Sequence, residues 1–238
     1  MRSHWQRLFD QLQRSSPAQL VQRQALLARQ IQENGVTYNV YADPKGADRP
    51  WELDLLPHVI AADEWQQLSA GIAQRARLLN AVLADLYGPQ RLISEGLLPA
   101  ELVFGHNNFL WPCQGIVPPD SAFLHLYAVD LARTPDGRWW VTADRTQAPS
   151  GAGYALENRT IVSRAFPELY RDLKVQHLAG FFRTLQETLA RQAPTDDEAP
   201  LVVLLTPGRF NESYFEHLYL ARQLGYPLVE GGDLTVRD

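Results

Sequence analysis

Hydrophobic residues recur at steps of three and four along residues 62–87, and this period predicts the clearest helix of the chain. Asp63 is placed to cap its start, and Gly88 followed by Pro89 stops it. The opposite face of this helix is polar, and we interpret it as solvent-facing, with a functional site as the alternative. Its polar residues are Gln74, Arg75, Asn80 and Asp85.

Residues 4–34 predict two helices that are separated at Ser15, Ser16 and Pro17. Ser16 is a good helix cap, and Pro17 fits the first turn of the second helix. The second helix is expected to end at Asn34, just before a glycine. We therefore expect residues 1–34 to form an appended helical arm.

Alternating apolar and polar positions over residues 123–144 predict a β-hairpin. Asp136 and Gly137 form a dipeptide that commonly reverses a strand pair. Asp130 and Asp144 should therefore lie on neighbouring strands.

The pattern changes near the end of the chain. After a glycine-bearing loop, residues 166–192 are expected to be helical, and residues 193–200 are typical of a polar linker. Residues 201–238 then give a strand, a helix closed by Gly225 and a second strand, an order that predicts a βαβ crossover. One such unit has too few strands to bury its own sheet, so we expect the chain to be an N-terminal piece of a longer protein. The predicted fold class is α/β.

Composition narrows the class of protein. Of the 238 residues, 45% are hydrophobic and 21% are charged, and no apolar run reaches the roughly 20 residues of a membrane helix. The N-terminus lacks a secretory signal, so we expect a soluble, cytoplasmic protein that does not bind a membrane. A net charge of −5 argues against a nucleic-acid partner. The lone Cys113 excludes an internal disulfide and is expected to be a small buried hydrophobe.

Polar residues gather around the loop that follows the hairpin. Oxygens of the type that Mg²⁺ prefers are found in Asp130, Asp144, Glu157 and Asn158. An anion could be held by Ser150 and by the backbone amides of Gly151 and Gly153, and its charge could be neutralised by Arg133 or Arg159. On residue types alone, these residues fit a metal–phosphate site less well than turn geometry and a solvated hairpin.

Four spaced blocks of sequence favour the metal–phosphate site over the structural interpretation. They are WELDLLPHVI, GIAQRARLLNAVLADLYGPQRLISEGLLPAELV, LYAVDLARTPDGRWWVTADRTQAPSGAGYALENR and LLTPGRFNESYFEHLYLARQLGYPLVEGGDL. In this order the chain resembles the circularly permuted ATP-grasp family of type 2, which includes glutathionylspermidine-synthase-like bacterial proteins, from about Gly35 to Asp238.

The resemblance implies an ATP-dependent carboxylate–amine ligase that uses Mg-ATP and an acyl-phosphate intermediate. It implies that residues 35–192 are the metal- and phosphate-binding half and that residues 201–238 are the truncated start of a Rossmann-like pre-ATP-grasp domain. The implied partners are small-molecule or peptide carboxylates and amines. Their identity is not readable from the sequence.

Asp130 corresponds to the first metal-binding acid of the family. Relatives carry Leu-Glu-Asp-Asn on the next strand, whereas this chain has Ala143 in place of the glutamate and Arg145 in place of the asparagine. Three outcomes are open. Asp144 takes over metal ligation with Glu157 and Asn158, Arg145 acts as a fixed cation in place of one metal, or the chain has lost catalysis and kept binding.

Lysine supplies a further expectation. ATP-grasp lids hold nucleotide phosphates with lysines, yet Lys45 and Lys174 both lie outside any lid-like hairpin. The resemblance places the lid beyond Asp238, so we expect this chain alone to lack ligase activity.

Two rival functions remain. The substitutions at 143 and 145 also fit a degenerate ATP-grasp scaffold that acts as a binding module. Asp130 and Glu157 could instead form the paired carboxylates of a glycoside hydrolase, which needs acids about 5 to 9.5 Å apart beside a sugar cleft. That hypothesis explains neither the βαβ pattern nor the order of the blocks.

Overall fold

The computed structural model describes residues 3–41, 50–195 and 200–236. The chain forms two compact units, unit 1 with residues 1–60 and 150–238, and unit 2 with residues 61–149. These divisions differ from the predicted boundaries at 34, 192 and 200, and the domain assignment stays a prediction. Lys45 and residues 196–199 of the predicted linker lie outside the described residues. No helix of the described ranges combines the length and the apolar character needed to cross a membrane.

The predicted pair of N-terminal helices is confirmed in unit 1. Helix α1 spans Ser3–Arg14 and α2 spans Pro17–Glu33. The Ser16 hydroxyl accepts a hydrogen bond from the Gln19 backbone amide, and the Gln19 side chain accepts one from the Ser16 amide. This reciprocal capping box fixes the start of α2.

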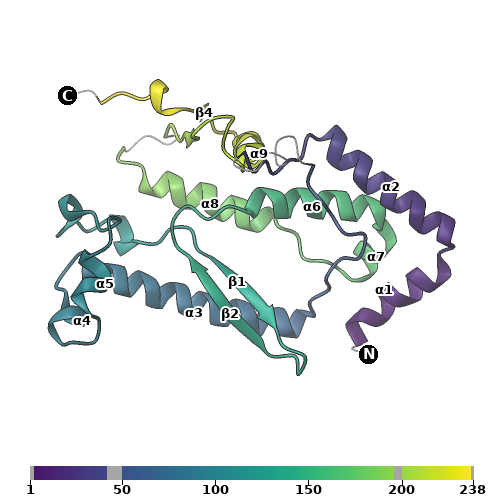
Figure 1. Ribbon diagram of the computed structural model, residues 1–238, viewed down its shortest axis with the longest axis horizontal. Coiled ribbons are helices and arrows are strands. Elements are labelled where there is room, and N and C mark those ends of the chain that lie inside the picture. The colour runs from purple at the N-terminus through teal and green to yellow at the C-terminus, as the bar shows by residue number, and fades with distance from the viewer. Residues whose placement is uncertain (1–2, 42–49, 196–199, 237–238) are drawn as a thin grey trace. The chain divides into compact units, whose positions relative to one another are not determined.

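The N-terminal helices share their core with later helices of unit 1. These are α6 (Ala152–Ala165), α7 (Pro167–Asp172), α8 (Ala179–Gln192) and α9 (Tyr214–Leu224). Helix α2 packs against α6, and α1 packs against α7 (Figure 1). The core residues are Leu8, Leu27, Ile31, Val36, Tyr154, Ile161, Ala165, Phe166 and Leu169. The arm expected to be appended is therefore built into the hydrophobic core of this unit.

Two expectations for the middle of the chain need correction. The loop after the hairpin ends earlier than expected, since α6 begins at Ala152 and Gly153 is a helical residue. The expected single helix over 166–192 is divided into α7 and α8 by residues 173–178, where Lys174 has a positive φ of 50°. A backbone in that left-handed region cannot continue a right-handed helix.

The strand–helix–strand order near the end of unit 1 is confirmed. Strands β3 (Leu204–Leu205) and β4 (Leu228–Val229) pair in parallel, and α9 crosses between them. Gly225 ends α9 with a φ of 70°, a conformation that glycine adopts without a side-chain clash. Two strands of two residues do not establish a Rossmann-like domain, which stays a prediction.

Unit 2 contains the long helix and the hairpin. Helix α3 spans Ala62–Leu86, followed by α4 (Arg91–Ser94), α5 (Ala100–Phe104) and the short 3-10 turns η1 (Trp111–Cys113) and η2 (Pro119–Ser121). Strands β1 (Ala128–Arg133) and β2 (Trp139–Arg145) pair antiparallel, which confirms the hairpin, although its first strand begins later than predicted. The expected cap is wrong, because Ala61 is the N-cap and Asp63 lies within the first turn.

Candidate functional site

The two hairpin aspartates lie on opposite faces of the strand pair. Asp130 is paired with Ala143, and Asp144 is paired with Val129. Opposite residues of an antiparallel pair share a face, and successive residues of a strand alternate between faces. Asp130 therefore shares its face with Ala143 and Arg145, and Asp144 projects from the other side.

Arg145 holds the Asp130 carboxylate in a two-pronged contact. Its Nε lies 3.0 Å from Oδ1 and its Nη2 lies 2.7 Å from Oδ2. Hydrogen bonding to Arg145 lowers the pKa of Asp130. The side chains of Arg145 and Asp130 are 58% and 45% exposed, so this ion pair stands open to solvent on the hairpin face.

Asp144 is held in the same manner by α3. Arg75 donates from Nε and Nη2 to the two carboxylate oxygens at 2.6 Å each, and the Tyr127 hydroxyl donates at 2.5 Å. The bonds from Arg75, and then from Tyr127, lower the pKa of Asp144 to about 2. Burial and the contact with Asp144 raise the pKa of Tyr127 to about 12.

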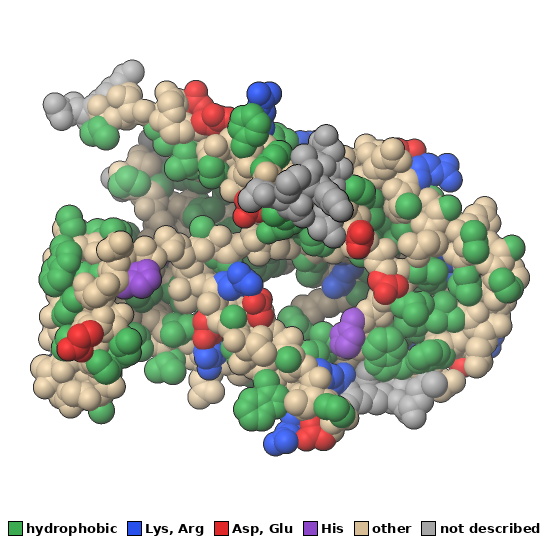
Figure 2. Space-filling view, viewed as in Figure 1, with side chains coloured by type: hydrophobic (Ala, Val, Ile, Leu, Met, Phe, Trp, Pro, Cys, Tyr) green, Lys and Arg blue, Asp and Glu red, His purple; other side chains and the backbone are tan. Residues whose placement is uncertain are grey.

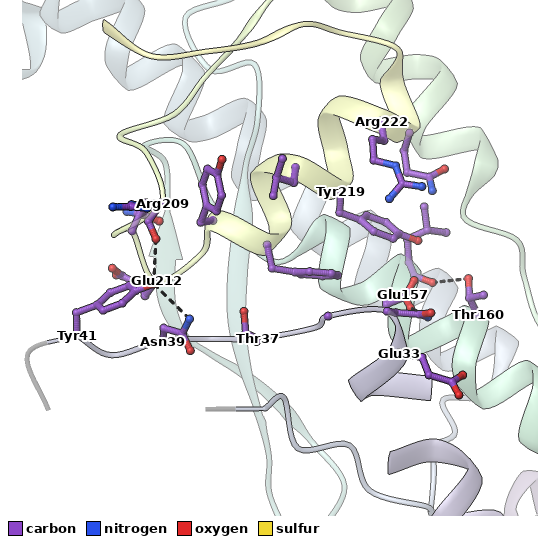
Figure 3. A pocket seen from close by; sticks show the side chains of 18 of the residues that line it. Glu33, Thr37, Asn39, Tyr41, Glu157, Thr160, Arg209, Glu212, Tyr219 and Arg222 are labelled. Atoms are coloured by element: carbon purple, nitrogen blue, oxygen red, sulfur yellow. Dashed lines mark hydrogen bonds between the residues drawn. The ribbon is translucent and has the colours of Figure 1, made fainter. Parts of the chain in front are cut away.

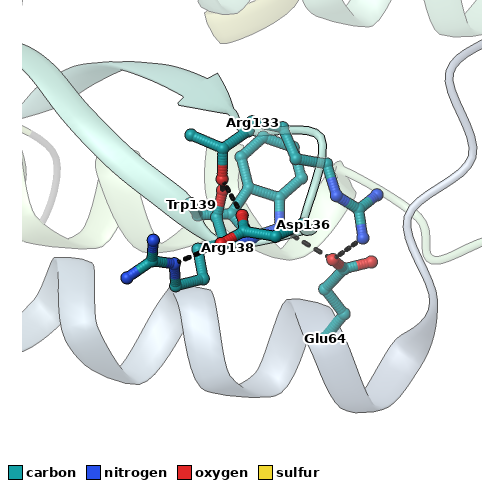
Figure 4. Close-up of polar contacts among 6 residues, drawn as sticks. Glu64, Arg133, Asp136, Arg138 and Trp139 are labelled. Carbon is teal, nitrogen blue, oxygen red and sulfur yellow. Dashed lines mark hydrogen bonds and ion pairs between the residues drawn. The ribbon is translucent and has the colours of Figure 1, made fainter.

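Arg133 braces the other end of the hairpin against α3 (Figure 4). Its guanidinium pairs with Glu64, which also accepts a hydrogen bond of 2.8 Å from the indole N–H of Trp139. The guanidinium lies 5.1 Å from the centre of the Trp139 ring. These contacts join the hairpin to α3. Acidic and basic side chains alternate over this part of the surface (Figure 2).

The polar face of α3 has a structural use that the sequence did not reveal. Besides Arg75, its Asn80 side chain accepts hydrogen bonds from the backbone amides of Phe123 and Leu124 at 2.8 and 3.0 Å. The Asp85 carboxylate likewise accepts the amides that open α4. These three side chains therefore bond other segments of unit 2, while Arg75 also stays exposed to solvent.

In unit 1, three consecutive residues of α6 tie that helix to other segments. Glu157 is only 3% exposed and accepts a 2.5 Å hydrogen bond from the Asn34 amide group. Asn158 accepts one of 2.9 Å from the Trp51 indole N–H. Arg159 donates a hydrogen bond of 2.6 Å to the backbone carbonyl of Gln176.

The start of α6 is occupied by a carboxylate. Glu216 of α9 is 1% exposed and accepts hydrogen bonds of 2.7 Å from the amides of Gly151 and Gly153. Burial raises the pKa of Glu216, and the amides of Gly153 and Gly151 oppose that shift. A Cβ at Gly153 would lie 2.9 Å from the Glu216 Cγ, so this position requires glycine. The two amides predicted to bind phosphate thus donate to Glu216, and Ser150 beside them is exposed.

A cleft of about 710 Å³ lies within unit 1 (Figure 3). Its walls come from α6, α9, residues 33–41 and residues 209–214. Glu157 belongs to its lining, together with Arg164, Arg209 and Arg222. No local pattern of residues predicts this cleft, because its walls come from segments far apart along the chain.

The predicted metal ligands are divided between the two units, and each has a hydrogen-bond partner within its own unit. Asp130 and Asp144 belong to unit 2 and face opposite sides, and each carboxylate is already matched by an arginine. Glu157 and Asn158 belong to unit 1 and bind Asn34 and Trp51. No group of three or more histidine, cysteine or acidic side chains suited to a metal occurs within the described ranges. The metal assignment stays a prediction.

Comparison with known proteins identifies relatives of the whole chain. The sequence model of the family described as circularly permuted ATP-grasp type 2 matches residues 57–238. An uncharacterized protein of Synechocystis sp. is 40% identical over 231 residues, which cover 97% of this chain and 48% of that protein.

Mycobacterial proteins are similar to the chain to a comparable degree. An uncharacterized protein of Mycobacterium tuberculosis is 42% identical over 246 residues, with 100% of this chain and 28% of that protein covered. One from Mycobacterium leprae is 37% identical over 238 residues and is covered over 42% of its length. The chain therefore spans between about a quarter and half of the length of these relatives.

Proposed function

Because the chain belongs to the circularly permuted ATP-grasp type 2 family, we propose that it forms part of an ATP-dependent carboxylate–amine ligase. The observation that carries this proposal is the match over residues 57–238, which includes both the hairpin and the strand–helix–strand unit. The family suggests an ATP-dependent ligase-type fold, and its members typically bind ATP and Mg²⁺.

The proposed reaction joins an acid to an amine in two steps. A carboxylate oxygen of the acid attacks the γ-phosphorus of ATP, and ADP leaves. The amine nitrogen then attacks the acyl carbon, inorganic phosphate leaves, and the nitrogen loses a proton to give the amide. Both steps concentrate negative charge on the phosphoryl group, so the protein must present positive charge there.

Arg145 is the residue of the hairpin best suited to supply that charge. It shares a face with Asp130, which corresponds to the first acid of the family pattern, and it stands where relatives have an asparagine. A guanidinium is permanently charged and matches phosphate oxygens in a forked geometry. We therefore favour the hypothesis that Arg145 acts as a fixed cation in this chain.

A binding module without catalysis is the second candidate function. It is favoured by the pairing of both hairpin carboxylates with arginines, since an Asp–Arg pair of this kind also stabilises a hairpin without any ligand. Under this hypothesis the chain keeps the family fold and recruits a partner.

Nucleotide binding separates the two functions. Calorimetry of the full-length protein with a non-hydrolysable ATP analogue, with and without Mg²⁺, is expected to show binding that Arg145→Gln weakens by at least about tenfold, or about 1.4 kcal/mol. Arg138→Gln is the matched control, because Arg138 pairs with the exposed Asp136 in the hairpin turn. No nucleotide binding by the full-length protein would refute the ligase and leave the binding module.

A further inference from the structure

The cleft of unit 1 has the size of a small-molecule site. Its volume of about 710 Å³ lies within the range of roughly 300–1,000 Å³ found for ligand pockets. One end is closed by contacts between its walls (Figure 3), since the Tyr41 hydroxyl donates to the Arg209 carbonyl at 2.9 Å. The backbone amide of Asn39 donates to the backbone carbonyl of Glu212 at 3.3 Å.

Three arginines line this cleft with their charge unmatched. Arg164, Arg209 and Arg222 form no salt bridge with any described aspartate or glutamate, whereas four arginines of unit 2 do so. Arg164 donates to the Gln30 side chain at 2.5 Å, which fixes its position without neutralising it. An arginine held in this way suits a carboxylate supplied by a ligand.

Acidic residues line the same cleft. Glu33 and Glu212 lie at its walls, and the buried Glu157 lies between Asn34 and Tyr219. Burial, and then hydrogen bonding to Glu157, raises the pKa of Tyr219 to about 12, so this hydroxyl stays a donor near neutral pH. A polyanion would meet three carboxylates here, and a simple cation would meet three arginines.

Charged side chains of both signs occur at each end of the cleft, and one end carries two arginines. Helices α6 and α9 run alongside in the same direction, because Gly153 lies against Glu216 while Glu157 lies against Tyr219, one turn further along both. Arg164 lies about two turns beyond Glu157 and Arg222 about one turn beyond Tyr219, so both lie toward the same end. Glu33 borders this end, since Gln30 donates to Glu33 and accepts from Arg164. Glu212 and Arg209 belong to the opposite end, before α9 begins (Figure 3).

We propose that this cleft binds a small zwitterion, an amino acid or a short peptide, with its carboxylate at Arg164 and Arg222. The side-chain amides of the lining match the peptide groups of such a ligand, since each offers both a donor and an acceptor. They belong to Asn34, Asn39, Asn211 and Gln223. The ligand has the chemistry of an acid substrate of the ligase proposed above, and only this role rests on that proposal.

Binding is tested on this chain without ATP. The probes are alanylalanine, alanylglutamate, alanyllysine and alanylphenylalanine, each also prepared with its C-terminal carboxylate amidated. Binding is measured by ligand-observed NMR at probe concentrations up to about 10 mM, so that dissociation constants of about 1 mM are also detected. We expect at least one free dipeptide to bind and its amide to bind at least about tenfold more weakly.

Arg222→Gln and Arg164→Gln are each expected to weaken that binding by about tenfold or more, whereas Arg171→Gln leaves it unchanged. Arg171 is an exposed arginine of α7 outside the cleft, and circular dichroism checks that each variant is folded. No binding by any of the four dipeptides, or equal binding of acid and amide, would overturn the inference. Dipeptide binding by a full-length protein that does not bind nucleotide would remove the ligase and leave this site standing.

Discussion

The buried contact between Glu216 and the start of α6 gives a quantitative test of the structure. Glu216→Ala removes the acceptor of the Gly151 and Gly153 amides. Glu216→Gln keeps an acceptor oxygen in place and removes only the charge. Both variants therefore report on the same two hydrogen bonds, one by deletion and one by neutralisation.

The expected magnitudes follow from the burial of this contact. A buried donor left without an acceptor costs about 1–3 kcal/mol, so two such donors in Glu216→Ala should lower the free energy of unfolding by about 3–4 kcal/mol. Two unsatisfied donors would together cost about 2–6 kcal/mol, and we expect the lower half of this range because removing the carboxylate also removes its desolvation cost. Glu216→Gln keeps a neutral acceptor and also loses the desolvation penalty that raises the pKa of Glu216, so it should change the free energy of unfolding by less than about 1 kcal/mol.

Urea unfolding followed by circular dichroism measures the free energies of unfolding. Hydrogen exchange of residues 150–165 shows whether the loss is local to α6. Glu187→Ala on α8 is the matched control, since this glutamate is exposed and is expected to change stability by less than about 0.5 kcal/mol. A loss in Glu216→Ala no larger than that of the control would refute the proposed role of Glu216.

The contribution of Glu216 to stability should change with pH in a direction that can be tested. Burial raises the pKa of this carboxyl above its ordinary value of 4.5, so the folded state binds the proton more tightly than the unfolded state does. The stabilisation is present below pH 4.5 and is lost as pH rises through the folded-state pKa. Glu216→Gln should remove this component, and an unchanged pH profile would contradict it.

Further predictions concern other contacts of the chain. The contribution of Asp144 to the stability of the hairpin should be present above pH 3.8 and be lost as pH falls through about 2, and Asp144→Asn should abolish this dependence in acid titrations followed by tryptophan fluorescence. Gly153→Ala should destabilise the chain by about 1–3 kcal/mol in urea, whereas Gly180→Ala, where a Cβ meets open space in α8, should stabilise it by about 0.5–1 kcal/mol. This chain by itself should show no ATP turnover in a coupled ADP assay, and turnover that Arg145→Gln abolishes would contradict that expectation.

Local patterns predicted much of the fold because each depends on neighbouring residues. The capping box at Ser16, the turn at Asp136 and Gly137, and the end of α9 at Gly225 are all set within a few positions of the chain. The period of apolar residues likewise gave α3 almost to the residue. By contrast, the pairing of Arg75 with Asp144 joins residues 69 positions apart, and no local pattern encodes it.

The candidate site was harder to predict than the fold because its polar groups bind one another. Gly151 and Gly153 have the freedom that an anion-binding loop needs, and the anion they meet is a side chain 65 and 63 residues further along. Asp130 likewise meets Arg145. Residue types indicate which groups carry charge or can donate a hydrogen bond, whereas the partner of each group depends on the packing of the whole unit.

The two internal pairings differ in how readily a nucleotide could replace them. The Asp130–Arg145 pair is about half exposed on both sides, and exposed ion pairs contribute little to stability, so phosphate oxygens could engage Arg145 at small cost. The Glu216 carboxylate is buried on the amides at the start of α6, and displacing it would leave a charge without partners in the core. If the chain takes part in nucleotide binding, the hairpin face is therefore the place for the phosphates, and Glu216 is a structural anion. Arg145→Gln should then weaken nucleotide binding by the full-length protein without changing its unfolding, and Glu216→Ala should do the reverse.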